Sequence, residues 1–309
     1  MYFIPLPDDD ENPCKLADWL EINSLINPFR PVSYEKLRSD LTSLKTPEKL
    51  QDIVSQTSTE LDNRSRHLKD AYPFSINATL LRVKDSKLQT FNWAYVFCLI
   101  ISFIGLEIGQ NKLKIWKIKE MSFQFEEICA LAAKNYLGNM ECDSEVLHFG
   151  YPRLLWHENL RPFKKALEHL REQINDGRIR GTSRQRAKDG GLDVVAWNHF
   201  PDRRAGKLLL LGQCAASQDK YAEKMHEVKQ FLENDIEIQS QRMLAFFIPH
   251  ALNIEFEEHA QQWMEINSNA GILFDRCRIS FFAKNWDDAE FKRKLPISLR
   301  HLRSYCKSL

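Results

Sequence analysis

Glycine and proline are scarce in this chain, with 11 and 12 among 309 residues, and no segment of it is a repeat or of low complexity. Disorder is therefore not expected. A strong charge of one sign is also lacking, because the formal net charge is only +1. Any contact with phosphates then has to come from a local patch. The length allows one large domain or two ordinary ones.

Metal-binding cysteine motifs are absent as well. The seven cysteines are scattered, none forms a CxxC pair, and no histidine lies at zinc-finger spacing from them. This pattern argues against a structural zinc and favours a reducing compartment over a disulfide framework. The first residues, MYFIPLPDDDENP, turn acidic at once and do not match a secretory signal. We expect a cytoplasmic protein.

The chain also lacks an apolar run long enough for a membrane span, which needs roughly 20 residues. The run WAYVFCLIISFIGL, at residues 93–106, is shorter and is followed by Glu107. We interpret it as a fully buried helix and expect no membrane partner. A membrane-associated protein stays a third alternative, behind the two functions that the rest of the sequence indicates.

Residues 1–118 have a mainly helical pattern. Helices are expected from Leu16 to just before Pro28, after a cap at Ser33, and from Pro47, with a strand at 75–83. None of these segments carries a motif with chemical meaning. We expect an N-terminal domain that recognises a target or binds a partner.

Residues 119–309 read differently, as alternating helices and strands. This order predicts an α/β domain with a mixed sheet flanked by helices. The strand expected last is interrupted by Asp275, Arg276 and Arg278, for which we expect a buried ion pair, with a phosphate-binding arginine as the alternative. The expected helices are 123–137 with Ser122 as cap, 160–174, 219–232, 255–267 and 286–305, and the expected strands are 146–149, 192–197, 207–215, 243–248 and 271–281.

Two polar residues interrupt the apolar strands of this region. Asp193 lies in LDVVAW, and Gln213 lies near the end of KLLLLGQCA. A buried strand accommodates a carboxylate only with a partner, because desolvating the charge is costly. Two oxygen donors near the ends of adjacent strands can hold a hard divalent cation such as Mg²⁺. That cation can activate water and stabilise charge on a phosphate.

Three short motifs follow one another in the same region. A Phe125-Glu126 pair lies in the helix expected after Ser122, GLDV follows at 191–194, and QCA follows at 213–215. With these motifs in this order, residues 122–235 resemble the PD-(D/E)XK nuclease superfamily, and most closely the Mrr-like restriction endonucleases.

The resemblance implies a restriction-endonuclease-like fold and a Mg²⁺-dependent endonuclease that hydrolyses DNA, in defence against foreign DNA. It implies that Asp193 is the principal metal ligand, that Gln213 supplies a neutral oxygen, and that Glu126 orients or shares the metal from the helix. Glu127 competes with Glu126 for that role. A protein partner in a defence complex and a homo-oligomer are both left open.

The chain departs from the family at one position. The family has a lysine two residues after the glutamine, on the same face of the strand, and here that residue is Ala215. Lys220 and Lys224 lie four residues apart in the helix expected next, on one face. We assign the catalytic lysine to Lys224, with Lys220 as the alternate. If neither reaches the site, the chain is a catalytically inactive nucleic-acid-binding or scaffolding subunit of a defence complex.

A basic segment precedes Asp193. Residues 177–188 hold five cations and no acid, a composition that can neutralise phosphates. A second basic group, near the C-terminus, offers a further contact surface. The first group consists of Arg178, Arg180, Arg184, Arg186 and Lys188, and the second of Lys292, Arg293, Lys294, Arg300, Arg303 and Lys307.

Each candidate also has a purely structural explanation. Asp193 can pair with an arginine, Gln213 can tie one strand to the next, and Glu126 can be a helix acid favoured by the helix dipole. The basic segment can be a solvated loop. Cys214 alternates away from Gln213, and no histidine is singled out by its spacing, so we interpret it as a core thiol rather than a nucleophile.

Overall fold

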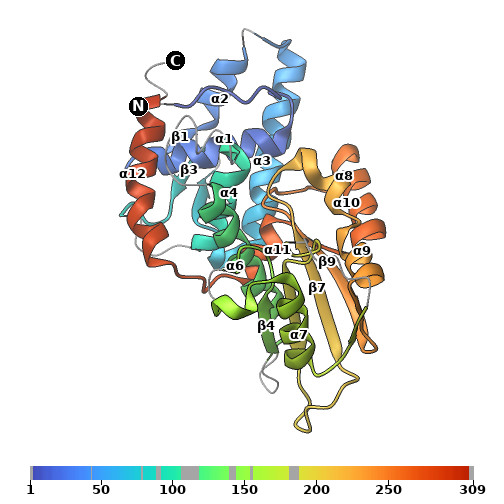
Figure 1. Cartoon of the computed structure of the whole chain (residues 1–309). Coiled ribbons are helices and arrows are strands. Elements are labelled where there is room, and N and C mark those ends of the chain that lie inside the picture. Colours follow the sequence, from blue (N-terminus) through green and yellow to red (C-terminus); the bar gives the residue numbers. More distant parts are fainter. Residues whose placement is uncertain are drawn as a thin grey trace. The chain divides into compact units, whose positions relative to one another are not determined.

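The computed structural model divides the chain into two compact units (Figure 1). The first division falls between Met121 and Ser122, close to the expected domain boundary at 118. The C-terminal helix was expected in the second domain but belongs to unit 1. Unit 1 comprises Met1–Met121, His250–Asn253 and Lys284–Leu309, and unit 2 comprises Ser122–Pro249 and Ile254–Ala283. Described residues are 3–42, 44–77, 79–87, 92–105, 118–138, 144–153, 156–180 and 188–305.

Unit 1 is mainly helical and holds a small antiparallel sheet of order β1-β3-β2. Side chains of Asn12, Ser33 and Thr46 cap its first three helices, as their residue types favour. The strand expected at 75–83 is a hairpin of two strands. The elements are α1 (Pro13–Ile26), β1 (Val32–Ser33), α2 (Tyr34–Leu41), α3 (Pro47–Leu68), a 3-10 turn (Lys69–Ala71), β2 (Phe74–Asn77), β3 (Leu80–Val83), α4 (Trp93–Ile104) and α12 (Ala289–Tyr305).

A buried ion cluster lies at the centre of unit 1. The Arg64 guanidinium donates to Glu60 at 2.6 Å, to Asp18 at 2.7 Å and to Glu21 at 3.0 Å. These contacts give the acidic residues of α1 partners although α1 is buried on nearly every side. The apolar helix α4 is buried too, and within the described residues no helix is long and apolar enough to span a membrane.

Unit 2 is built on a mixed five-stranded sheet of order β10-β9-β7-β6-β4 (Figure 1). The strands β10, β9 and β7 run parallel, whereas β7, β6 and β4 pair antiparallel. The α/β fold class expected for this region is therefore confirmed. The strands are β4 (Ser144–His148), β6 (Val194–Asn198), β7 (Leu208–Cys214), β9 (Gln241–Phe247) and β10 (Ile272–Phe274), and a separate pair joins β5 (Arg178–Ile179) to β8 (Ile236–Glu237).

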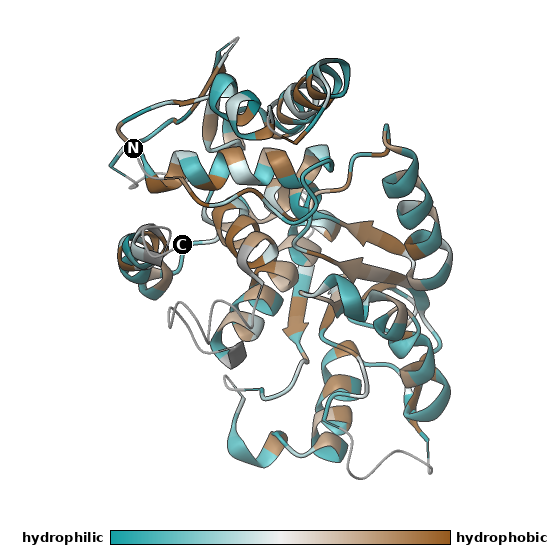
Figure 2. Cartoon of the chain, turned by 90° about the horizontal axis from the view of Figure 1, so that it is seen from above, coloured by the Kyte–Doolittle hydropathy of each residue, from teal (hydrophilic) through white to brown (hydrophobic). Residues whose placement is uncertain are grey.

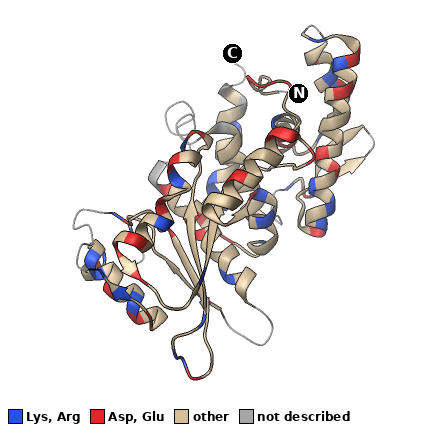
Figure 3. Ribbon diagram, turned by 90° about the vertical axis from the view of Figure 1, so that its right-hand side faces the viewer, with Lys and Arg blue, Asp and Glu red and all other residues tan. Residues whose placement is uncertain are grey.

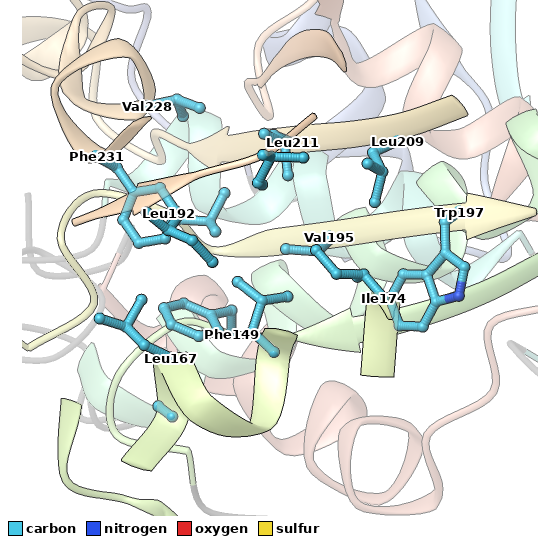
Figure 4. Packing of buried hydrophobic residues seen from close by; sticks show 14 of the residues in the cluster. Phe149, Leu167, Ile174, Leu192, Val195, Trp197, Leu209, Leu211, Val228 and Phe231 are labelled. Atoms are coloured by element: carbon cyan, nitrogen blue, oxygen red, sulfur yellow. The ribbon is translucent and has the colours of Figure 1, made fainter. Parts of the chain in front are cut away.

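Helices cover this sheet. On one face, side chains of α7 (Phe163–Ile174) and α9 (Glu227–Asn234) pack with alternate residues of β6 and β7 in one apolar cluster (Figure 4). The cluster includes Val195, Trp197, Leu209 and Leu211. In Figure 2 the strands are largely brown and the helices beside them carry teal residues outward, the pattern of a sheet buried under amphipathic helices.

On the other face lies α6 (Ile118–Leu137). The Cys214 thiol of β7 interacts with Cys129 of α6, and Nδ2 of Asn198 donates to the carbonyl of Leu137 at 2.8 Å. Cys214 is a fully buried thiol in this contact, as the interpretation of a core residue requires. Figure 3 shows most Lys, Arg, Asp and Glu on helices and loops, and the central strands mostly tan. A carboxylate at the end of a strand is therefore unusual in this unit.

Three expected elements differ from the structure. The helix expected from Ser122 already begins at Ile118. The helix expected at 219–232 is three short pieces, a 3-10 turn at Gln218–Lys220, α8 (Tyr221–Lys224) and α9. The strand expected at 271–281 is β10 followed by α11 (Arg276–Phe282), because the side chain of Asp275 caps that helix by accepting from the backbone N–H of Arg278. The remaining elements are a 3-10 turn (Glu158–Leu160) and α10 (Glu257–Ala270).

A candidate carboxylate site at the ends of β4, β6 and β7

Asp193 lies at a β-bulge just before β6. Val194 pairs with Gly212, yet the backbone N–H of Asp193 also donates to the carbonyl of Gly212, at 2.9 Å. The Asp193 carbonyl accepts from the N–H groups of Phe149 and Gly150, at 2.7 and 3.0 Å. Asp193 and Val194 thus both oppose Gly212, which re-aims the Asp193 side chain, and contacts on both sides fix its backbone.

The Asp193 carboxylate is held between β7 and α6. Its Oδ2 accepts from the backbone N–H of Cys214 at 2.8 Å. Its Oδ1 lies 3.1 Å from the point where a Cβ on Gly150 would stand, and Oε2 of Glu126 lies 2.1 Å from the same point. The absence of a side chain at Gly150 therefore makes room for two carboxylates from different elements. Asp193 is 5% exposed.

Glu126 is hydrogen-bonded to His148, the last residue of β4. Oε2 of Glu126 and Nε2 of His148 lie 2.5 Å apart. Burial and the charge of Asp189 raise the pKa of Glu126 to about 8, and burial lowers the pKa of His148. Both shifts favour a neutral pair over the ion pair that the distance alone would suggest.

The pKa of Asp193 is shifted in the same direction as that of Glu126. Burial and the neighbouring charge of Glu126 raise the pKa of Asp193 well above its usual range, while Lys224 acts in the opposite direction. Two buried carboxylates that repel each other bind a proton or a cation. Within the described residues there is no cluster of three or more His, Cys, Asp or Glu side chains arranged for a metal.

Lys224 reaches this pair, whereas Lys220 does not share its helix. The Lys224 ammonium donates to the carbonyl of Cys214 at 2.8 Å. Burial lowers its pKa, but the charges of Asp193 and Glu227 outweigh burial, so that the pKa of Lys224 is raised. Lys220 ends the preceding 3-10 turn and is exposed. The expectation that both lysines lie on one helix face was wrong, because the helix starts only at Tyr221.

Gln213 is not brought to the carboxylate pair. It alternates with Leu209 and Leu211, which pack under α7 and α9, while Cys214 faces α6. Gln213 is 2% exposed, and its Oε1 has no hydrogen-bond partner among the described residues. An oxygen donor is thus available, but on the face opposite to Cys214. Its role as a metal ligand stays a prediction.

The basic segment before Asp193 is only partly described. Arg178 lies exposed in β5. Arg180 donates from Nε to the carbonyl of Leu232 at 3.4 Å and lies 3.9 Å from Glu237. Lys188 lies over the ring of Tyr151, 5.9 Å from its centroid. Arg184 and Arg186 lie outside the described residues.

The C-terminal cations lie in unit 1, and three of them have acidic partners. Lys292 pairs with Asp287 at 2.6 Å, Lys294 with Glu290 at 2.7 Å and with Glu120 at 3.2 Å, and Arg293 lies 4.0 Å from Glu290. These contacts reduce the positive field that this helix offers to phosphates. The side chains of Arg303 and Lys307 lie outside the described residues.

Three residues near the pair were missed from the sequence. His148 is hydrogen-bonded to Glu126. Asp189 accepts from the N–H of Gly191 at 3.0 Å and raises the pKa of both carboxyls. Arg153 lies in the turn after β4 and acts on the same groups. The glycine at 150, two residues after His148, was the one sequence signal for this crowding. Glu127, which competed with Glu126, lines a cavity beside His148.

No family model and no curated protein matches the chain. Among solved structures, the chain is similar to MspJI restriction endonuclease in complex with a 27-mer oligonucleotide, at 12% sequence identity and a TM-score of 0.28. The match covers 68% of this chain but 39% of that one, so the chain spans well under half of the neighbour's length. A similarity at this TM-score defines neither fold nor function.

Proposed function

We propose that the chain is a metal-dependent nuclease that hydrolyses phosphodiester bonds of DNA at the Glu126–Asp193 pair. The observation that carries the proposal is the crowding of these two buried carboxylates around Gly150, with the ammonium of Lys224 beside them. Burial raises the pKa of both carboxyls, with the charge of Asp189 adding to it at Glu126 and the charge of Glu126 adding to it at Asp193. This is the condition under which a cation binds in place of a proton.

The pair suits Mg²⁺ better than a metal that needs a full protein cage. Mg²⁺ is commonly bound through one or two carboxylates, with waters and substrate phosphates as its other ligands. When bound, it would supply an activated water and stabilise charge on the scissile phosphate. Glu126 and Asp193 would hold it, and the Cys214 N–H would keep Asp193 in one orientation. Gln213 is a candidate further ligand only if its amide can turn toward this face.

Lys224 is suited to replace the family's lysine, whose position is occupied by Ala215 in this chain. An ammonium carries three N–H donors, and Cys214 accepts from one. The others can donate to a phosphate oxygen as negative charge develops there. The long side chain of Lys224 brings an ammonium from α8 to the end of β7, whereas the methyl group of Ala215 carries no charge.

Contacts with the rest of the DNA would come from the basic segment at 178–188, whose cations neutralise phosphates. Unit 1 would recognise the target or bind a partner. The sequence resemblance to Mrr-like restriction endonucleases is the ground for proposing a role in defence against foreign DNA.

A non-catalytic DNA-binding or scaffolding subunit is the second candidate function. One observation favours it: position 215 is a fully buried alanine, so the strand itself offers no ammonium to the reaction. On this alternative the Glu126–Asp193 pair keeps its proton and holds no cation.

Cleavage of plasmid DNA separates the two functions. The full chain is incubated with supercoiled plasmid in MgCl₂ and in EDTA, beside Asp193→Asn and Glu126→Gln. Asp202→Asn, a change in the exposed β6–β7 turn, is the matched control. The nuclease proposal expects Mg²⁺-dependent nicking that both site variants lose and the control keeps. Nicking that survives Asp193→Asn rules out the site, and binding without nicking favours the scaffold.

A further inference from the structure

A cavity of about 330 Å³ opens in unit 2 between α6 and β4. Its walls are mainly apolar, with Phe123 and Trp156 as the largest side chains. Its polar lining consists of Glu127, His148 and Arg153. Because His148 is hydrogen-bonded to Glu126, the cavity shares a wall with the carboxylate site. A ligand in it would lie next to the reacting groups.

Arg153 is the unusual member of this lining. Its side chain is almost completely buried, at 1% exposure, and its Nη1 donates to the carbonyl of Arg161 at 3.1 Å. Its Nε and Nη2 have no hydrogen-bond partner among the described residues. The guanidinium lies 4.6 Å from the ring centroid of Phe149 and 5.6 Å from that of Trp156, so aromatic packing fixes its plane.

A buried guanidinium with two unused donors is costly, because each N–H has lost its water without gaining a partner. A ligand that accepts hydrogen bonds from both N–H groups would offset this cost. Nε and Nη2 lie on one edge of the guanidinium, where two parallel N–H bonds match two oxygens of one phosphate. Burial lowers the pKa of Arg153 to about 10, so a bound anion would stabilise its charge.

We propose that this cavity binds a phosphate group of a nucleotide, with Nε and Nη2 of Arg153 donating to two of its oxygens and with Phe123 and Trp156 packing against the attached sugar or base. The apolar walls give the ring a place that a bare anion would leave empty. The proposal rests on the proposed nuclease function only in taking the nucleotide to be part of a DNA substrate. On that reading, Arg153 holds a phosphate adjacent to the scissile one.

DNA binding without cleavage tests the cavity directly. Anisotropy of a short fluorescein-labelled DNA duplex is measured in EDTA over a series of NaCl concentrations, for the full chain and for Arg153→Met and Arg153→Lys. Loss of one phosphate contact should reduce the slope of log Kd against log salt by about 1 in Arg153→Met. Arg153→Lys should recover most of the slope but bind more weakly, because lysine lacks the two-donor edge. Arg204→Met, an exposed arginine of the β6–β7 turn, should keep the slope.

The alternative source of the phosphate is a free nucleotide. Calorimetric titration with thymidine 5′-monophosphate should show binding to the full chain that Arg153→Met loses, even if the salt slope for DNA is unchanged. That result supports the cavity and reassigns its ligand. If Arg153→Met changes neither the DNA slope nor mononucleotide binding, the proposal is overturned.

A second variant covers the case in which Arg153→Met does not fold, as judged by circular dichroism. Ala130→Leu fills the cavity from α6 without removing a charge and should weaken the same binding. Unweakened binding in a folded Ala130→Leu overturns the proposal. Failure of the nuclease proposal is seen separately, as an absence of plasmid nicking in the full chain while the effects of Arg153→Met on binding persist.

Discussion

The backbone N–H of Cys214 donates to Oδ2 of Asp193 at 2.8 Å, across the end of the β6–β7 pair. This bond does two things at once. It satisfies a strand N–H that the bulge has left without a ladder partner, and it leaves Oδ1 of Asp193 free to face Glu126. A change at Asp193 therefore has a structural and a chemical consequence that can be separated.

Asp193→Asn and Asp193→Ala separate them. Asparagine keeps an oxygen that can accept from Cys214 and removes the buried charge, so the fold should be kept or stabilised while nicking is lost. Alanine leaves the N–H unsatisfied and should cost about 1–3 kcal/mol. Urea unfolding monitored by circular dichroism gives the free energies. Equal destabilisation by the two changes would contradict the assigned role of this bond.

The raised pKa of Glu126 predicts how stability depends on pH. Between pH 4.5 and about 8 the folded chain keeps a proton on Glu126 that the unfolded chain has lost. The free energy of unfolding should therefore fall as pH rises through this window. The groups that act on Glu126 are His148, Asp189, Lys224 and Arg153.

Glu126→Gln should remove much of this slope, and MgCl₂ should reduce it in the unaltered chain, because a cation favours the ionised carboxylates. Thermal melts across the window provide the measurement. Glu172→Gln, at an exposed acid of α7, is the control and should leave the slope as it is. A slope that Glu126→Gln does not reduce would place the titrating group elsewhere.

Substitution of Lys224 and of Lys220 should have different effects on the rate of nicking. Lys224→Met should lower the rate of plasmid nicking about 100-fold, since it removes a donor to the developing charge. Lys220→Met should leave the rate within the error of the measurement, because Lys220 lies exposed in the preceding 3-10 turn. Both variants should fold. Comparable losses in the two would show that neither lysine serves the site specifically.

Gln213 distinguishes a ligand from a core residue. Its Oε1 is buried without a partner, so Gln213→Met should raise the free energy of unfolding by about 1 kcal/mol. Nicking should persist if the amide stays on the α7 and α9 face. Gln230→Met, an exposed amide on α9, is the control for stability. If Gln213→Met abolishes nicking in a folded protein, Gln213 returns to the set of metal ligands.

The sequence predicted the sheet, its strand order along the chain and the unusual position of Asp193, because an acid in an apolar strand conflicts with burial. It could not predict the face of Gln213. Alternation along both strands placed the acid and the amide together, and the bulge at Asp193 shifts one side chain by one position. The local amino-acid composition does not predict such a bulge.

The other incorrect predictions concern the residues at which helices begin. Asp275 looked like a charge inside a strand but caps α11, so the apolar residues after it changed from strand to helix. Lys220 and Lys224 looked like one helical face, although Lys220 ends a 3-10 turn and Lys224 ends the short helix after it. Of the residues that act on the carboxylates, His148 ends β4 and Arg153 follows in the turn after it, and neither carried a motif of its own.

Gly150 gives the sharpest test of the carboxylate pair. Alanine there would place a Cβ 2.1 Å from Oε2 of Glu126 and 3.1 Å from Oδ1 of Asp193, so at least one carboxylate must move. Gly150→Ala should abolish nicking and cost about 1–3 kcal/mol of stability. Gly206→Ala, in the β6–β7 turn, has open space around its Cβ but a φ of +87°, and should cost about 1 kcal/mol without affecting nicking. Both variants are thus destabilised, and only one should lose the chemistry. Nicking that persists in a folded Gly150→Ala would mean that Glu126 and Asp193 need not meet for the reaction.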